Sequence, residues 1–310
     1  MISSIFGKTK PINYIILLVF LFVFYWFVHL VMFQQTYTVD QLFEQSVILG
    51  CLMLSIFLVN FITNRNKITG SNSLSILFYT LLIVFFPRVL LDSDAIFCSF
   101  FILLAVRRLL SLRSFKEVKL KIFDASVWIL IASLFYDWAL LYLLLVFVAI
   151  YFYQAKNIRN WLIPFVAIIA MSIITLAILV LLKDPYFLSD HYVFNMVITP
   201  SYFNDFENVA YLFLYVFIVL LSGLISYIRL GNVGLNWLMS MRLVLYLFLV
   251  GLVIFLFKSS SEHHPIMLTF FPSVVFMTTY LETIKKDRVK ELVLISVIVL
   301  PFIVLLSRIF

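Results

Sequence analysis

Apolar residues in this chain occur in long runs that short charged or polar stretches interrupt. A helix needs about 20 predominantly apolar residues to cross the hydrocarbon core of a membrane. Dividing the chain at its charged stretches predicts eleven helical segments, at residues 12–33, 44–62, 73–91, 95–111, 124–136, 138–154, 160–182, 209–228, 237–257, 265–282 and 291–309. We therefore expect an all-α polytopic transmembrane helix bundle, with residues 1–310 forming a single integral membrane domain.

The composition excludes both a soluble globular domain and a disordered chain. Hydrophobic residues make up 65% of the chain and charged residues 12%, whereas soluble domains have about 45–50% and about 25%. The first apolar run is longer than the apolar region of a signal peptide, so we expect it to be a retained span. Cys51 and Cys98 lie inside apolar runs without a C-x-x-C pattern. We expect buried free thiols there, and neither a zinc site nor a disulfide framework.

The positive charges indicate how the spans are oriented. If the N-terminus is cytoplasmic and the spans alternate, 18 of the 22 Lys and Arg residues fall on the inside. The other four fall outside: Arg88, Lys183, Lys258 and Arg308. Basic residues concentrate in the cytoplasmic loops of membrane proteins. We therefore expect a multi-pass membrane protein with its N-terminus inside and its C-terminus outside. The net charge of +7 then reflects basic inner loops and not a nucleic-acid interface.

The apolar stretch that follows Asp124 is interrupted only by Asp137. A single span here would invert the orientation of everything that follows, so the charge distribution favours two crossings or a re-entrant hairpin. The first arm, residues 124–136, rises only about 20 Å as a helix, less than the roughly 30 Å of the core. We expect Asp137 to lie below the outer surface, facing a water-accessible recess with Trp138 at its rim. The alternative is that Asp137 caps the helix that follows.

Residues 107–121, RRLLSLRSFKEVKLK, combine six basic residues with closely spaced leucines. Apolar side chains on one face, with cations around them, are typical of a helix that lies on the surface of an anionic membrane. We expect this stretch to form an interfacial helix on the inner leaflet and to bind anionic lipids. The alternative is an ordinary basic loop between two spans.

Of the 15 acidic residues, 10 fall on the outer side of this topology. Asp40 lies in the first outer loop, where a carboxylate can act as a general base or help to begin the next helix. Asp92 and Asp94 form a D-x-D pair, which can hold a divalent cation or cap a helix. Arg88 has the planar guanidinium that suits a phosphate group, but it can also extend to the membrane interface. The cofactor is unknown, and a divalent cation is the candidate that the acidic pair suggests.

All four histidines also fall on the outer side: His29, His191, His263 and His264. Because imidazole binds iron and zinc, a histidine-bound metal centre is one hypothesis. However, no two of these histidines have the i, i+4 spacing that places side chains on one helix face. The alternative is that they cap helices or lie at the surface.

Two stretches resemble an uncharacterised family of multi-pass bacterial inner-membrane proteins. They are GKTKPINYIILLVFLFVFYWFVH, at residues 7–29, and FDASVWILIASLFYDWALLYLLLVFVAIY, at residues 123–151. This resemblance covers most of the chain and implies an architecture, but no activity.

A looser resemblance, over roughly residues 12–182, is to the C superfamily of membrane glycosyltransferases, which use sugars carried on polyprenyl phosphate. These enzymes place an acid soon after the first span, as TVDQLFEQ does with Asp40, and further acids between the third and fourth spans, as LLDSDAIF does with Asp92 and Asp94. FFILLAVRRLL, and the broken pair WILIASLFYDWALLYLLL, also fit their order. The chain departs from them in its short first outer loop and in lacking a large outer domain.

This second resemblance implies the transfer of a sugar from a polyprenyl-phosphate carrier at the outer face. Asp40 and Asp94 would then be catalytic, whereas Arg88, Asp92 and Asp137 would bind the substrate. A second hypothesis is a non-catalytic subunit of an envelope export or assembly complex, which predicts an apolar groove or helix face for a partner. A third is a membrane oxygenase with a histidine-bound metal. Convergence of Asp40, Asp94 and Arg88 on one outer cavity would distinguish the first hypothesis from the second.

Overall fold

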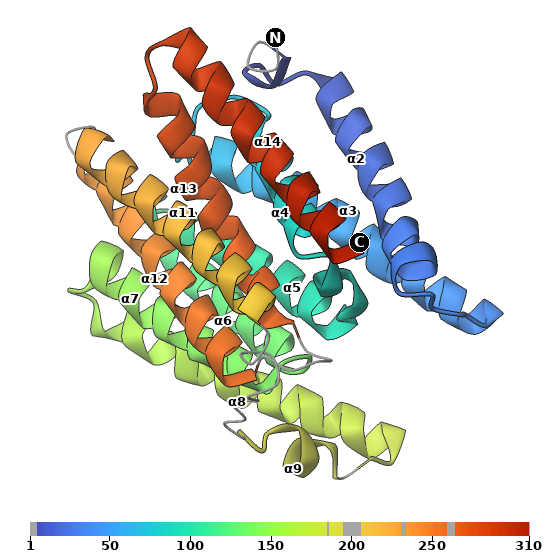
Figure 1. Ribbon diagram of the computed structural model, residues 1–310. Coiled ribbons are helices and arrows are strands. Elements are labelled where there is room, and N and C mark those ends of the chain that lie inside the picture. Colours follow the sequence, from blue (N-terminus) through green and yellow to red (C-terminus); the bar gives the residue numbers. More distant parts are fainter. Residues whose placement is uncertain (1–4, 185, 195–205, 231–233, 259–263, 310) are drawn as a thin grey trace.

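The computed structural model describes residues 5–184, 186–194, 206–230, 234–258 and 264–309, which form helices joined by short connections (Figure 1). Labels with α are α-helices, η1 is a π-helix and η2 to η5 are 3-10 helices. The described elements are α2 (Pro11–Trp26), η1 (Phe27–Met32), α3 (Val39–Arg65), α4 (Leu74–Phe85), η2 (Pro87–Leu91), α5 (Ser93–Leu110), η3 (Ser111–Ser114), α6 (Val118–Ser133), η4 (Asp137–Tyr142), α7 (Leu143–Gln154), α8 (Ile158–Leu182), α9 (Phe187–His191), α11 (Phe206–Leu230), α12 (Leu235–Lys258), η5 (Pro265–Thr269), α13 (Phe270–Thr283) and α14 (Asp287–Ile309).

Every one of the eleven predicted segments falls on a helix, so the prediction of an all-α bundle is confirmed. Nine helices of the described ranges are long and apolar enough to cross a membrane, and the chain is therefore a multi-pass membrane protein. The two remaining segments are α4, with 12 residues, and α6, with 16 residues. The two arms predicted on either side of Asp137 are α6 and the pair of η4 and α7, which follow each other without a break.

The short helix α4 forms the centre of the bundle. All of its 12 residues are buried, and α3, α13 and α14 pack around it. A helix that is apolar on every side requires this environment, because it has no polar face to turn to water. The sequence of α4, LSILFYTLLIVF, has this all-round apolar character.

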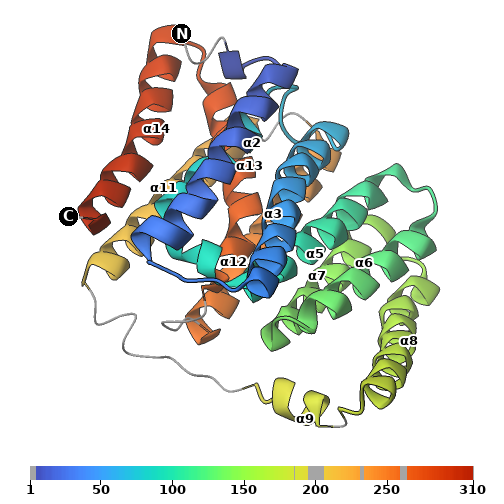
Figure 2. The ribbon, with the colours of Figure 1, turned by 90° about the vertical axis from the view of Figure 1, so that its right-hand side faces the viewer.

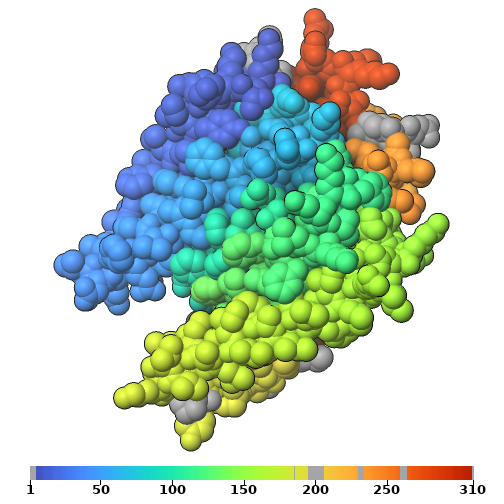
Figure 3. Space-filling model, turned by 180° about the vertical axis from the view of Figure 1, so that it is seen from behind, coloured from blue at the N-terminus to red at the C-terminus, as the bar shows by residue number. Residues whose placement is uncertain are grey.

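The helices α8, α11 and α14 form the periphery. Only 11% of the apolar window of α8 is buried, and 22% of the windows of α11 and α14. In Figures 2 and 3, α8 and α9 form a ridge along one edge of the molecule, with α8 packed mainly on α6. Apolar helix faces of this kind are suited to lipid or to another membrane protein.

Four of the five irregular helices in the described ranges lie at the same end of the bundle. With alternating crossings, η1, η2, η4 and η5 each fall at the end opposite to the start of α2, which is the predicted outer end. Contacts of η2 with both η1 and η5 confirm that these turns meet. Pro87 and Pro265 begin two of them, and proline fixes the backbone and cannot continue the hydrogen bonds of a preceding helix.

The predicted interfacial helix over residues 107–121 is wrong. Instead α5 ends, η3 follows, and the chain turns back through Phe115 and Glu117, whose φ angles of 54° and 50° are left-handed. The α6 helix then begins at once and packs along α5. The basic stretch is therefore a tight connection between two spans and not a helix along the leaflet.

Several of its cations hold this connection together, which explains why the prediction failed. Arg108 pairs with Asp124 at 2.8 Å. The ammonium group of Lys121 donates to the Ser111 carbonyl at 2.9 Å and to the Ser114 hydroxyl at 2.7 Å. Because these charges have partners within the protein, their spacing along the sequence does not define a lipid-facing surface.

Hydrogen bonds connect the loop between α3 and α4 to α12 and α13 at the predicted inner end of the bundle. The Glu282 carboxylate of α13 accepts hydrogen bonds from the Gly70 amide at 2.8 Å and from the Asn72 side chain at 2.5 Å. The indole of Trp237 in α12 donates to the Ile68 carbonyl at 3.1 Å. Bonds between distant parts of the chain therefore brace both ends of the bundle.

Candidate functional site

The predicted site acids lie near a polar cluster where η2, η4 and η5 meet the start of α5 and the end of α12. We call this cluster, formed by Asp92, Tyr136, Asp137, Lys258 and His264, the outer junction. It contains two acids that are buried in a membrane protein. Such acids are costly, and by default they suggest a functional site.

Asp92 connects three chain segments. Its Oδ1 accepts a hydrogen bond from the Ala95 amide at 2.9 Å, which caps the N-terminus of α5. Its Oδ2 accepts from the Tyr136 hydroxyl at 2.7 Å and from the backbone amide of His264 at 2.6 Å. A carboxylate has about four acceptor positions, and three of them are already used. Asp92 therefore acts as a brace, with little capacity left for a metal ion.

Asp94 lies in the first turn of α5, two residues beyond Asp92, and its side chain is exposed. The two carboxylates of the D-x-D pair therefore occupy different environments. Arg88, in η2, is also exposed. Within the described ranges, no group of three or more His, Cys, Asp or Glu side chains is arranged to hold a metal ion.

Asp40 lies in the first turn of α3 and is exposed. The helix is capped by Thr38 and Gln41, whose side chains each bond to the backbone amide of the other, at 3.5 Å and 2.9 Å. A carboxylate beside this cap is favourable, because the first turn carries the positive end of the helix dipole. This end of α3 projects from the bundle in Figure 1. None of the grooves described below is lined by Asp40, Arg88 or Asp94.

Asp137 is buried and faces a cation. Its Oδ1 lies 3.2 Å from Nζ of Lys258 at the end of α12, and the side chains of Asp137 and Lys258 are 3% and 28% exposed. The neighbouring Trp138 stacks on Phe257 with ring centroids 5.3 Å apart. The expectation that Asp137 faces a water-accessible recess is therefore wrong, because its side chain is buried and paired with Lys258.

The aromatic residues after α9 cover this part of the junction from the outer side. His191 Nε2 lies 2.8 Å from the Ser133 carbonyl, and the hydroxyls of Tyr192 and Ser133 are 2.9 Å apart. Phe194 packs edge-on against Trp138. Burial raises the pKa of the Tyr192 phenol, so this group stays protonated and can donate its hydrogen bond.

His29 joins η1 to η2 and is not free to bind a metal. Its Nδ1 is hydrogen-bonded to the Tyr37 hydroxyl, and its Nε2 lies 3.1 Å from the Leu90 carbonyl. Burial raises the pKa of Tyr37, so the phenol keeps the proton that it donates to Nδ1. The ring also stacks on Tyr25, at 4.3 Å between centroids.

Among the residues that the structure describes, the other predicted histidines belong to no group that could hold a metal ion either. His264 contributes its backbone amide to Asp92, and His191 bonds to the end of α6. His263 and Glu262 lie outside the described residues.

Three polar atoms of η4 are buried without a hydrogen-bond partner in the described part of the chain. They are Oδ1 of Asp137, which the Lys258 ammonium group faces at 3.2 Å, Nε1 of Trp138 and the Tyr142 hydroxyl. The Tyr142 hydroxyl lies against Gly251 of α12, since a Cβ at that glycine would be 3.0 Å from it. Sequence patterns did not identify this contact, and a lone glycine in an apolar run was its only signal.

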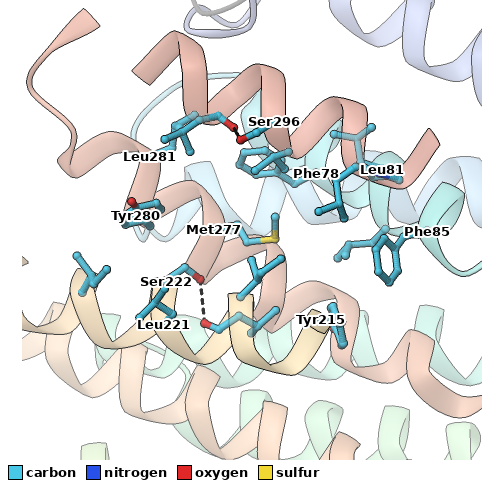
Figure 4. A pocket seen from close by; sticks show the side chains of 18 residues that line it. Phe78, Leu81, Phe85, Tyr215, Leu221, Ser222, Met277, Tyr280, Leu281 and Ser296 are labelled. Atoms are coloured by element: carbon cyan, nitrogen blue, oxygen red, sulfur yellow. Dashed lines mark hydrogen bonds between the residues drawn. The ribbon is translucent and has the colours of Figure 1, made fainter. Parts of the chain in front are cut away.

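A second candidate site is a lateral groove between α11 and α14, with α4 and α13 as its floor (Figure 4). It has a volume of about 250 Å³ and is almost entirely apolar. The two serine hydroxyls in its wall are already bonded on their own helices, Ser222 to Val219 and Ser296 to Val293, each at 2.8 Å. The groove therefore offers mainly shape and apolar contact.

On its other side, α11 borders a further apolar groove of about 400 Å³, next to α12. Helix α11 is therefore anchored mainly on α13. Polar contacts support this anchoring, because the Tyr215 hydroxyl lies 2.7 Å from Thr269 Oγ1 and 2.6 Å from Ser273 Oγ. Further along, Thr279 donates to Ser226 at 3.1 Å. Hydrogen bonds of this kind typically contribute about 0.6 kcal/mol each between membrane helices.

Comparison with known proteins gives a family but no activity. The sequence profile of a family of unknown function, DUF6427, matches residues 15–309. No curated protein and no solved structure matches the chain.

Proposed function

The chain belongs to the DUF6427 family, and we propose that it is a non-catalytic subunit of a membrane complex in the bacterial envelope. The observation that carries this proposal is the lateral groove between α11 and α14. We place the protein in the inner membrane on the distribution of its basic residues. The proposed partner is a protein with a transmembrane helix that packs beside α11.

The groove suits a helix for three reasons. It opens sideways on a face where α11 and α14 are largely unburied. Its walls expose large apolar side chains, such as Leu221 at 45%. Its two serine hydroxyls are already bonded within the protein. Association between membrane helices depends on close van der Waals packing, and a groove walled by two helices offers more contact than a single convex helix does.

The state of the outer acids supports a structural role for this end of the molecule. Asp92 braces three segments, and Asp137 is paired with Lys258. A hydrolase or transferase would need a carboxylate with free acceptor positions facing a substrate cavity. These two acids instead stabilise the junction.

Photo-crosslinking in native membranes tests the proposal. A photoreactive phenylalanine analogue replaces Leu221 in the groove, and the matched control replaces Leu176, which is 51% exposed on the distant helix α8. We expect a discrete protein adduct from position 221 and lipid adducts from position 176. Lipid adducts alone at both positions would contradict the proposal.

A second candidate function is glycosyl transfer from a polyprenyl-phosphate carrier at the outer face. It is favoured by the broken pair of α6 and η4–α7, the arrangement that the looser resemblance implies, although Asp137 and Trp138 stand where those enzymes commonly have a basic residue or proline. In this proposal Asp40 acts as base, Asp94 orients the acceptor or a divalent cation, and Arg88 holds the lipid phosphate, with Asp92 and Asp137 supporting the substrate region.

The two functions differ in what purified protein can do alone. The test incubates the reconstituted chain with a radiolabelled polyprenyl-phosphate sugar and a hydroxyl-bearing acceptor fraction from the envelope, and follows the transfer of label from the carrier to the acceptor. Glycosyl transfer predicts turnover that Asp40→Asn reduces by at least about 100-fold, as expected on losing a general base, and that Asp94→Asn also reduces. Absence of turnover in the purified chain, together with a partner at the groove, favours the structural role.

A further inference from the structure

A crevice lies between α2 and α3 at the predicted inner end of the bundle, the end opposite to the outer junction. It has a volume of about 810 Å³. Its deeper walls are apolar and include Ile15 and Leu18 of α2 and Phe57 and Phe61 of α3. An apolar furrow between two membrane helices, open to the side, has the shape that receives a hydrocarbon chain.

The mouth of the crevice is basic. Lys10 and Arg65 line it, and both side chains are exposed. Arg107 adds a third cation, since its guanidinium lies 4.9 Å from the ring centroid of Phe61. No acidic residue lines the crevice. The cations are therefore available to an anion, in contrast to Arg108 and Lys121, which have partners within the protein.

A chain of polar groups leads from the mouth into the crevice. Nδ2 of Asn64 donates to Oδ1 of Asn60 at 3.0 Å, and Asn60 in turn donates to the Tyr14 hydroxyl. All three residues line the crevice. Because these side chains bond to one another, the charge of a ligand is left to the cations at the mouth.

We propose that this crevice binds one anionic phospholipid of the inner leaflet. The phosphate lies between Lys10 and Arg65, and an acyl chain lies along Ile15 and Phe57. The arrangement places positive charge at the mouth and apolar side chains beside it, as the phosphate and the acyl chains of a phospholipid require. The site shares Arg107 with the stretch at residues 107–121, for which the sequence alone had predicted lipid binding, but its other two cations, Lys10 and Arg65, lie outside that stretch.

The test titrates the purified full chain in mild detergent with phosphatidylglycerol, and with phosphatidylcholine as the neutral probe. Native mass spectrometry counts the bound lipids. We expect one phosphatidylglycerol to bind more tightly than phosphatidylcholine. A cation near a membrane surface contributes roughly fivefold to binding an anionic lipid, so Lys10→Gln with Arg65→Gln should weaken this first binding event by about 25-fold.

The matched control is Lys116→Gln with Lys119→Gln, which removes two exposed cations from the same end of the molecule. This variant should bind the first phosphatidylglycerol as tightly as the unchanged protein does. Should the Lys10 and Arg65 variant not fold, Asn64→Asp tests the site, because its added negative charge should weaken binding about fivefold. Three results would overturn the proposal. The first is equal binding of both lipids, and the second is an equal loss of lipid affinity in the Lys10 and Arg65 variant and in the control variant. The third is displacement of the lipid by inorganic phosphate at equal concentration.

Discussion

Asp92 and Asp94 differ in role although they stand two residues apart in one motif. Asp92 is buried and accepts three hydrogen bonds from three segments, whereas Asp94 is exposed in the next turn. The D-x-D pattern shows that two acids are close in sequence, but which of them is buried depends on the packing of η4 and η5. The role of each acid follows from its surroundings and not from the motif.

We predict that Asp92→Asn destabilises the fold, while Asp94→Asn has little effect. An amide at position 92 places an NH₂ group where a carboxylate oxygen now accepts hydrogen bonds. Hydrogen bonds to charged groups contribute about 1.5–3 kcal/mol each, so we expect a loss of about 2–3 kcal/mol for Asp92→Asn. A change at the exposed Asp94 should stay within about 0.5 kcal/mol. Thermal unfolding in detergent, followed by tryptophan fluorescence, measures both, and equal effects would show that Asp92 is not the brace.

The pair of Asp137 and Lys258 gives a second prediction. Lys258→Met removes the cation and leaves a buried carboxylate, which should destabilise the protein by about 3 kcal/mol or more. Asp137→Asn in addition to Lys258→Met removes the uncompensated charge and should restore much of this loss. A double-mutant cycle on unfolding free energies measures the coupling. Additive losses would mean that the two groups do not interact, despite their separation of 3.2 Å.

At the scale of helices, the apolar runs correctly predicted the position of each of the eleven segments. This was possible because the thickness of the membrane sets the number of consecutive apolar residues that a spanning helix needs. The contacts between helices were not predictable in this way. His264 bonds to Asp92 across 172 positions of sequence, and no local pattern indicates such a pairing. The helix predicted over residues 107–121 was wrong for a related reason. Local periodicity does not show that Arg108 pairs with Asp124 of the next helix, or that Lys121 bonds back to Ser114.

Helix α12 contains a test of how closely these elements pack. A Cβ at Gly251 would lie 2.9 Å from Thr269 Cγ2 and 3.0 Å from the Tyr142 hydroxyl. Gly251→Ala should therefore push α12 away from η5 and η4, with a loss of about 1–3 kcal/mol typical of overpacking.

The matched control for this substitution is Gly50→Ala in α3, where a Cβ would meet no atom within 4 Å. Alanine is favoured over glycine inside a helix by roughly 0.5–1 kcal/mol, so this variant should be slightly stabilised. Opposite signs of the two changes in melting temperature are expected. The same sign for both would show that packing at Gly251 is looser than described.

At the scale of the whole molecule, the arrangement of helices is compatible with alternating crossings, and the membrane orientation remains a prediction from the basic residues. Reporter fusions after Lys121 and after Phe310 should report opposite sides, with Lys121 cytoplasmic. A cytoplasmic signal at both positions would require an even number of crossings between them. This result would contradict the alternating crossings from α6 to α14.

The bond between Asp92 and His264 has a consequence for the order in which the protein is made. Ribosomes add about 5–20 residues per second, so the 172 positions between the two residues correspond to a delay of roughly 10–30 s. During this interval the early helices enter the bilayer while Asp92 lacks one of its three partners. Until η5 has been synthesised, the outer junction is incomplete, because the His264 amide has not yet bonded to Asp92. An insertion factor or chaperone that shields this carboxylate would have to act within that time.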